Sequence, residues 1–437
     1  MKNNIKTIFF LLITLSFVVA CSDFTDGINE NPNTFTSAPG SMLIGQANME
    51  VVKLFTSQAG RTSGIFTDQF TGADRQYVSL NDYVTTAGDY DDDWGDLYAS
   101  GFMQAKLAEA DAVASGNKIL EGVAQIIQGM LVAEAASLWG NVPFTEAGDY
   151  VKFPNPNYDG QKSVLDAAQV LFSKGIANVG TATVAISFGA PVYKSNSATW
   201  AKIGHSLKAR YYLVAKDYPN ALTSAKLGIS NRTEDLLTNH ANIAGQKNMY
   251  FQFLAELRAG MLNVSNSHLG KLVKGVTPRL LATPGESQRA AFYFTGVDLR
   301  TSSGGVFAVD ASLPIISFVE TKLIEAEAAN RTGADALTPF NAVRAELASV
   351  YTGSFPASTA TGNALLLQIL EEKYISLLGQ TQIFHDVRRT NNAIGVPVKG
   401  VGATKIPQRF LYAQTEINAN KNFPGLIDLY IATPVNQ

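Results

Sequence analysis

The only cysteine of the 437-residue chain, Cys21, directly follows an apolar run over residues 8–20. A single thiol can form neither an internal disulfide nor a multi-cysteine metal site, so its position is the informative feature. Lys2 and Lys6 give the run a positively charged start, and the run is too short to span a bilayer as a helix. The pattern predicts an export signal over residues 1–20 that is removed from the mature chain.

The junction Val18-Val19-Ala20-Cys21 resembles the bacterial lipobox, in which the cysteine sulfur receives a diacylglycerol and becomes the new N-terminus. The lipobox usually has Leu where Val18 stands, and a plain secretory signal with an incidental cysteine is the alternative. Stable anchoring needs more than one acyl chain, which a diacylated cysteine supplies. We expect lipid attachment at Cys21 and a tether over residues 21–40, which are rich in Asn, Gly, Pro, Ser and Asp.

Motifs of catalysis are missing from the sequence. None of the histidines lies in the zinc-protease motif H-E-x-x-H, and the sequence has no G-x-S-x-G nucleophile elbow. We therefore expect no catalytic metal and no cofactor. The four histidines are His205, His240, His268 and His385.

The acidic segment DYDDDWGDLY (89–98) contains Asp91, Asp92 and Asp93. Calcium prefers several oxygen ligands, so these carboxylates are a candidate calcium site. The full calcium-loop signature is missing, and acidic side chains also favour the positive end of a helix dipole. We expect acids at a helix start, with calcium as the alternative.

The segment QIFHDVRRTNN (382–392) combines Asp386 with Arg388 and Arg389. Arginine forms bidentate ion pairs with carboxylates, so a network of charges is expected here. Its function is either to bind an anionic ligand or to fasten a late helix to the body of the protein. We expect the structural clamp.

Composition favours a globular domain, since 46% of the residues are hydrophobic and 16% are charged. Removing Lys2 and Lys6 with the signal changes the formal charge from −3 to −5. No basic patch stands out, which disfavours nucleic acid as a partner. Because no low-complexity linker follows residue 40, we expect one large domain over residues 41–437.

Helical periodicity dominates the domain. Apolar residues share one face in the segment that ends at Gly140-Asn141-Val142-Pro143, and in 199–215 and 318–333. Pro219 can start a further helix, and Thr338 can cap another. The second and third segments with their successors predict helical hairpins of tetratricopeptide-like size. Helices are also expected at 95–115, 163–177 and 363–378.

Long irregular loops and few strands are expected between these helices. Segment 304–310 (GGVFAVD) is a candidate short strand, and Trp94 is assigned to the helical scaffold. The expected irregular stretches are 57–93, 140–162, 180–196, 232–315 with interruptions, and 351–362. Such long loops usually serve a function.

Six segments, in order behind the lipobox, resemble motifs of the SusD/RagB-type outer-membrane lipoproteins of Bacteroidetes, in their SusD-like branch. They cover most of the mature chain. They are WGDLYASGFMQAKLAEA (94–110), GMLVAEAASLWGNVPFTEA (129–147), TWAKIGHSLKARYYLVA (199–215), FVETKLIEAEAANRTG (318–333), ILEEKYISLLGQTQIFHDVRRTN (369–391) and IPQRFLYAQTEINANKN (406–422).

The resemblance implies a helical scaffold with tetratricopeptide-like pairs, held to the outer membrane by lipid and facing the cell surface. It implies a non-catalytic protein that binds glycans, or peptides in some members, and passes them to a TonB-dependent SusC-like barrel. The motifs belong to the scaffold and do not define the ligand. Asparagine-rich loops favour a sugar, with a peptide as the alternative.

A sugar site needs exposed aromatic faces and groups that hydrogen-bond hydroxyls. Two loop stretches, RQYVSLNDY (75–83) and AAFYFTGVD (290–298), contain both kinds. For each stretch the alternative is that its aromatics fold back onto the core. The candidate ligand-binding residues are Arg75, Tyr77, Asn81, Asp82, Tyr83, Tyr293 and Asp298.

Two other functions compete with nutrient binding. Tetratricopeptide-like pairs often bind proteins, which allows a lipoprotein scaffold that faces the periplasm. A surface glycosidase would need two carboxyl groups facing each other across a cleft. Protease accessibility on whole cells separates the first alternative from nutrient binding, and release of reducing sugar separates the second.

Overall fold

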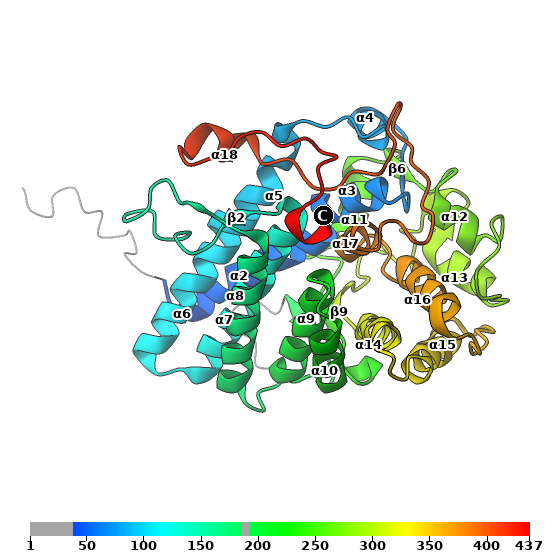
Figure 1. The fold of residues 1–437 in the computed structure, drawn as a ribbon, viewed down its shortest axis with the longest axis horizontal. Helices are drawn as coiled ribbons and strands as arrows, with labels where there is room; N and C mark the ends of the chain where they lie inside the picture. Colours follow the sequence, from blue (N-terminus) through cyan, green and yellow to red (C-terminus); the bar gives the residue numbers. More distant parts are fainter. Residues whose placement is uncertain (1–37, 185–191) are drawn as a thin grey trace, which may run out of the picture. The chain divides into compact units, whose positions relative to one another are not determined.

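Helices make up most of the residues that the computed structural model describes, 38–184 and 192–437 (Figure 1). Gly40–Gln437 form one compact unit. The expected signal over 1–20, the expected lipid attachment at Cys21 and all but the last three residues of the expected tether over 21–40 lie outside the described residues. The mainly helical fold class with few short strands is confirmed.

The longer α-helices are α2 (Gly40–Thr56), α3 (Gln58–Phe66), α6 (Met103–Ser115), α7 (Lys118–Trp139), α8 (Gln161–Val179), α9 (Trp200–Val214), α10 (Tyr218–Leu227), α13 (Glu286–Tyr293), α14 (Phe318–Thr332), α15 (Leu337–Tyr351), α16 (Gly362–Ser376) and α17 (Thr381–Arg389). The short α-helices are α4 (Gln76–Asn81), α5 (Asp91–Gly95), α11 (Met249–Phe251), α12 (His268–Val273) and α18 (Gln414–Ala419). The 3₁₀-helices are η1 (Ala87–Tyr90), η3 (Arg232–Glu234) and η5 (Pro434–Asn436), and η2 (Asp96–Phe102) and η4 (Gln252–Leu257) are π-helical.

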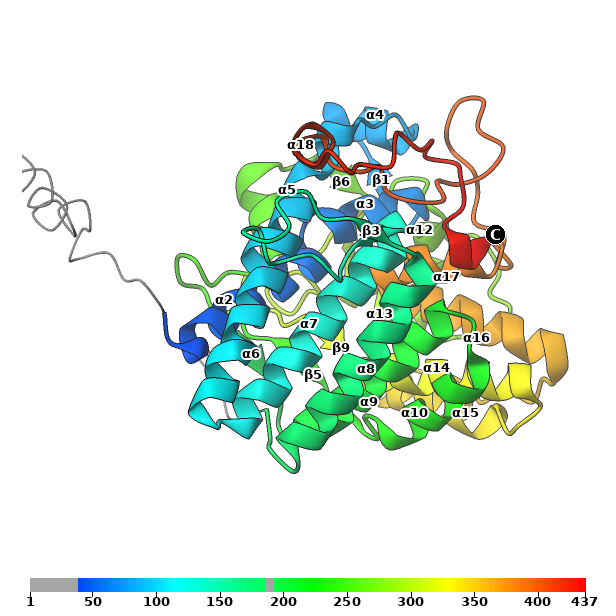
Figure 2. The same ribbon diagram turned by 60° about the vertical axis from the view of Figure 1, so that its left-hand side comes forward.

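Within this unit, successive helices pack side by side in a row that begins with α6, α7 and α8 and continues through α9, α10 and α14 to α15 and α16. Figures 1 and 2 show the row along the lower part of both views. The segments that carry α4 and α18 lie along the upper edge in both views. The row therefore forms a frame, and loop-borne elements gather beside it.

Helix α7 forms the centre of the frame. It is the one helix of the described residues long and apolar enough to cross a membrane, yet 94% of its apolar window is buried in the protein. A Cβ on Gly122 would lie 2.7 Å from the Gly175 carbonyl oxygen of α8, so glycine permits the two backbones to approach closely. These features identify α7 as a core helix.

Two helical hairpins follow the predicted sequence signals. Thr199 caps α9, its side chain accepting from the N–H of Lys202 at 3.3 Å, and Pro219 lies in the first turn of α10. Helix α14 ends at Gly333, whose φ of 74° lies in the left-handed region. The cap of α15 differs from the prediction. Asp335 rather than Thr338 accepts the first-turn N–H groups.

The strands are short and antiparallel. They form the pairs β1 (Thr71–Gly72) with β6 (Leu262–Asn263), β2 (Val142–Pro143) with β3 (Tyr158–Asp159), and β7 (Phe294–Thr295) with β8 (Asp298–Leu299), and the three-stranded sheet β4 (Tyr193–Lys194), β5 (Leu236–Thr238) and β9 (Pro314–Ile316).

Two expectations about local structure are wrong. Segment 304–310 forms turns, not a strand. Gly305 N–H donates to the Ser302 carbonyl, and the more distant bonds, such as Val306 N–H to the Phe292 carbonyl, do not form a ladder. Stretch 57–93, expected to be irregular, contains α3, α4 and η1. Helix α3 carries three small residues, Ala59, Gly60 and Gly64, whose positions pack against neighbouring side chains and backbone. Tertiary packing here overrides weak helix propensity.

The expected clamp is confirmed. Arg389 pairs with Glu327 of α14 at 2.5 Å and with Asp386 at 2.6 Å, all within the interior. Arg388 donates to the carbonyls of Ser137 and Gln408, both at 2.8 Å. These bonds tie α17 to α14, to α7 and to the C-terminal segment.

Candidate functional site

Three neighbouring cavities lie around the segment that joins α4 to α5. The first encloses about 360 Å³ and the second about 630 Å³, and Val84 and Thr85 line both. The third encloses about 320 Å³ and meets the first at Gln58, which lines both. The loop Tyr83–Ala87, which we call the strap, separates the first cavity from the second. Volumes of this size suit small polar ligands or a few sugar units.

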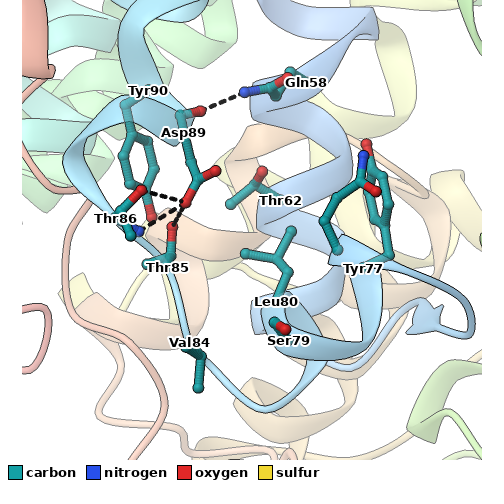
Figure 3. A pocket seen from close by; sticks show the side chains of 11 residues that line it. Gln58, Thr62, Tyr77, Ser79, Leu80, Val84, Thr85, Thr86, Asp89 and Tyr90 are labelled. Carbon is teal, nitrogen blue, oxygen red and sulfur yellow. Dashed lines mark hydrogen bonds between the residues drawn. The ribbon is translucent and has the colours of Figure 1, made fainter.

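The first cavity lies between α3, α4 and the strap (Figure 3). Tyr77 stands on one side, Asp89 and Tyr90 on the other, and Thr62 and Leu80 lie between them. The Asp89 carboxylate accepts from the Thr86 N–H at 2.7 Å and the Thr85 hydroxyl at 2.9 Å. This capping box holds the strap in place.

The second cavity lies between the strap and the C-terminal segment. Phe423 and Tyr430 are half-buried, so each keeps part of its ring open to the cavity. Gln414 and Asp428 are exposed polar groups on the same wall. Aromatic faces beside amide and carboxylate groups are the combination that binds sugar rings and their hydroxyls.

The third cavity is lined mainly by polar side chains from α2, α3, α5 and η2: Lys53, Ser57, Gln58, Arg61, Asp92, Asp93 and Asp96. Lys53 pairs with Glu50 at 2.8 Å and with Asp96 at 2.6 Å. Burial raises the pKa of Asp93 to about 7, although Arg61 counteracts the effect. A carboxyl with this pKa exchanges its proton near neutral pH.

Unusual backbone marks the same region. The π-helix η2 supplies Asp96 to the third cavity, and Phe253 of the π-helix η4 packs its ring 5.2 Å from that of Tyr77. Tyr83 has a φ of 63°, uncommon for a bulky residue. Such features are frequent at functional sites.

Two of the five candidate residues predicted from stretch 75–83 reach the cavities. Tyr77 lines the first cavity, and its hydroxyl accepts from Arg61 Nε at 3.2 Å. Tyr83 lines the second cavity, and its hydroxyl accepts from the Lys399 N–H at 3.2 Å. Both rings are mostly buried, so they form cavity walls more than open platforms. Burial also raises the pKa of Tyr83 to about 12.

The other three candidate residues of this stretch lie outside the cavity linings. Asn81 accepts from Lys399 Nζ at 2.9 Å and from the Gly72 N–H at 3.2 Å, a framework role. Asp82 is half-buried close to Lys399. Arg75 is exposed beside Asp74.

The second predicted stretch lies elsewhere. Tyr293 is 3% exposed and donates to the Ile375 carbonyl at 3.2 Å, so its ring belongs to the core. Asp298 is exposed at the start of β8. Neither lines the three cavities.

Sequence reasoning missed the residues within 411–430 that line the second cavity. Their apolar run FPGLIDLY (423–430) is interrupted by Pro and Gly and follows α18. An apolar run without helical or strand periodicity near a chain end could have marked a ligand-facing segment. Its proximity to Tyr83 is a long-range contact that no local pattern reveals.

The aspartates considered for calcium lie in the first turn of α5, as the helix-start interpretation predicts. Asp91 accepts from the Thr415 N–H at 2.8 Å, whereas Asp93 is buried. Trp94 packs edge-on against Trp139 at 5.2 Å, within the scaffold as expected. Among the described residues, no group of three His, Cys, Asp or Glu side chains could hold a metal ion.

Comparison with known proteins gives one family. The family model SusD-like_2, described as starch-binding and associating with the outer membrane, matches residues 32–413. No curated protein matches the chain.

Solved structures share the fold at low sequence identity. A SusD/RagB family protein from Bacteroides thetaiotaomicron is 18% identical, with a TM-score of 0.66 over 88% of this chain and 95% of its own. A chitin-binding SusD homolog from Flavobacterium johnsoniae is 14% identical, with a TM-score of 0.66 over 87% and 93%. A SusD homolog from Bacteroides uniformis is 16% identical, with a TM-score of 0.66 over 90% and 99%. The fold and the matched family model together show that this chain belongs to the SusD-like family of starch-binding proteins that associate with the outer membrane.

Proposed function

We propose that this protein is a lipid-anchored, cell-surface receptor that binds glycan oligomers and delivers them to a SusC-like, TonB-dependent barrel without cleaving them. The observation that carries the proposal is the pair of cavities on either side of the strap, which we call the groove. Together they offer ring faces, amides, carboxylates and hydroxyls on the two sides of the strap. The family description adds starch as a ligand class and the outer membrane as the location.

The second cavity supplies the sugar-stacking part of the groove. The half-buried rings of Tyr430 and Phe423 can each cover one face of a pyranose, where the C–H groups lie. Gln414 and Asp428 lie on the same wall to bond ring hydroxyls. Because the rings are fixed by the surrounding packing, little ordering entropy opposes binding.

A binding screen tests this proposal. The purified chain is titrated with maltoheptaose, chitohexaose and an unrelated hexapeptide. We expect at least one oligosaccharide to bind, and Tyr430→Ala to weaken that binding five- to tenfold, about 1 kcal/mol. Tyr150→Ala is the matched control, since Tyr150 is 72% exposed and lines neither part of the groove. Binding of the peptide alone would replace the glycan with a peptide as ligand.

The location depends on Cys21. Cys21→Ser removes the acceptor sulfur, so we expect the protein to leave the outer-membrane fraction and become soluble on cell lysis. On intact cells, protease should reach the wild-type chain. Protection from protease would instead support a scaffold that faces the periplasm.

Delivery and the absence of catalysis have separate readouts. A barrel should copurify with the wild-type chain from detergent-solubilised outer membranes, and a clean monomer would contradict delivery. Incubation of the bound oligosaccharide with the protein should release no new reducing ends. Release of reducing sugar would make the protein a glycosidase.

A further inference from the structure

The third cavity holds a buried carboxylate oxygen without a partner. Asp93 is 5% exposed, and its Oδ2 atom makes no hydrogen bond in the described part of the chain. The carboxylate receives one bond from the backbone N–H of Ala59, in the first turn of α3. The helix therefore holds the carboxylate, while its Oδ2 atom is covered by neighbouring protein atoms and has no partner. Asp93 itself is part of the wall of the third cavity.

An unpaired buried acceptor is unfavourable, since its desolvation is not offset by a hydrogen bond. Proteins retain such groups where a ligand or water completes the set. Ser57 stands on the same wall, and its side chain makes no capping bond to α3. The cavity thus offers a free acceptor and a free hydroxyl, besides the guanidinium of Arg61 and the amide of Gln58.

The mixture of charges indicates which ligand fits. Carboxylates would repel an anion, and Lys53 and Arg61 would repel an ammonium group. A neutral polyol suits both signs, because each hydroxyl donates to one neighbour and accepts from another. A sugar unit has several such hydroxyls, and about 320 Å³ accommodates one unit.

The third cavity adjoins the groove. Gln58 lines both the third and the first cavity, and it donates to the Asp89 carbonyl, which belongs to the first. Arg61 of the third cavity donates to the hydroxyl of Tyr77, which lines the first. Gln58 is therefore the wall between the two cavities, and a ligand that spans both must displace its side chain.

We propose that the third cavity is a subsite for one end unit of a glycan, in which two neighbouring hydroxyls bond the Asp93 carboxylate and the Ser57 hydroxyl. This proposal rests on the glycan-binding function proposed above. It deepens that function because the protein would then recognise the ends of glycan chains. Such a protein would bind a free oligosaccharide more tightly than the interior of a long polymer.

The subsite makes binding depend on pH. Burial holds the Asp93 pKa at about 7, and hydroxyl donors favour the ionised form, so affinity should rise from pH 6 to pH 8. Replacing Asp93 by a residue that does not titrate should flatten this rise. The charged and titratable groups that face Asp93 or its cavity are Arg61 from α3, Asp92 from α5, Asp96 from η2, Lys53 and Glu50 from α2, and Tyr90 from η1.

The test uses the purified full chain titrated with maltoheptaose and chitohexaose at pH 6, 7 and 8. Asp93→Asn should lower affinity about tenfold at pH 8, the loss expected for a bond to a charged group, and abolish the rise with pH. Ser57→Leu puts an apolar side chain into the cavity and leaves the Asp93 side chain itself unchanged, and it should cause a similar loss. Asp166→Asn, the same chemical change on the exposed face of α8, should behave as wild type.

The outcomes separate this proposal from the function on which it rests. If Ser57→Leu binds as wild type does, the third cavity is not a subsite, whether or not Asp93→Asn folds. If Tyr430→Ala weakens binding while both third-cavity variants leave it unchanged, the groove stands and the subsite fails. If neither oligosaccharide binds the wild type, both proposals fail. If the protein binds the oligosaccharide more tightly than an equal mass of soluble starch or chitin polymer, this supports recognition of chain ends.

Discussion

Two of the regions in which this protein buries charged side chains do so in opposite ways. Under α13, α15 and α16, the arginine–glutamate cluster pairs each guanidinium with a carboxylate. It comprises Arg279, Arg289, Arg344, Glu286, Glu371 and Glu372. In the third cavity, Asp93 keeps an oxygen unpaired. Charges that are fully paired within the protein hold the frame, whereas the incompletely paired Asp93 is where we propose that a ligand binds.

Glu372 is the centre of the paired region. Its carboxylate bonds Arg289 at 2.7 Å and Arg344 at 2.6 Å, and Arg279 lies at 3.0 Å. Although burial acts to raise it, the three guanidinium groups hold the Glu372 pKa well below its ordinary value. A carboxylate so paired stabilises the fold above its unfolded-state pKa, and this stabilisation is lost in acid.

The largest expected loss of stability comes from removing a carboxylate from the arginine–glutamate cluster. Glu372→Gln leaves arginines buried without their counter-charge, so the free energy of unfolding should fall by about 3–5 kcal/mol in urea denaturation. Asp166→Asn breaks only an exposed pair and should change stability little. A loss as small as that of the control would show that the cluster does not hold the frame.

Asp93 in the third cavity should have a smaller effect on the free energy of unfolding, and this effect should depend on pH in the opposite direction. Because burial raises the Asp93 pKa to about 7, the folded state binds a proton that the unfolded state has released. The free energy of unfolding should therefore fall by about 2–3 kcal/mol from pH 5 to pH 8 through this group. Asp93→Asn should remove that part of the slope.

The slope of the wild type contains a second contribution. Burial raises the pKa of Asp235 to about 7 as well, although the Phe318 N–H donates to its carboxylate. Asp235 is unchanged in Asp93→Asn, so the difference between the two proteins isolates Asp93. Parallel stability curves for wild type and variant would show that Asp93 does not titrate in this range.

The smallest expected effect on folding is that of Ser57→Leu. The Ser57 side chain is half-buried at an open cavity and caps nothing, so its replacement should change the free energy of unfolding by less than about 0.5 kcal/mol. With the binding loss expected above, this variant would separate ligand binding from stability. A large loss of stability would place Ser57 in the frame instead.

Sequence reasoning predicted the frame because local signals determine it. The cap at Thr199, Pro219 and Gly333 all act within one turn of their own helix. It failed for α3, because packing rather than propensity makes that segment helical. It also failed for 304–310, where an apolar sequence finds no partner strand in the described residues.

The site was predictable only in part. Tyr77 and Tyr83 were recognisable as loop aromatics beside polar residues, and both line the cavities. Tyr430 was not, because it meets the strap only after the whole frame has folded between them. Asp93 looked like one of several helix-start acids, and only the three-dimensional structure shows its oxygen to be unpaired.

The most direct test of this account is a crystal structure of the protein soaked with the tighter-binding of maltoheptaose and chitohexaose. The account predicts sugar rings in the groove, one of them stacked on Tyr430, and an end unit with a hydroxyl within hydrogen-bond distance of the Asp93 carboxylate. An oligosaccharide bound on another face of the molecule, with the groove and the third cavity left open, would contradict it.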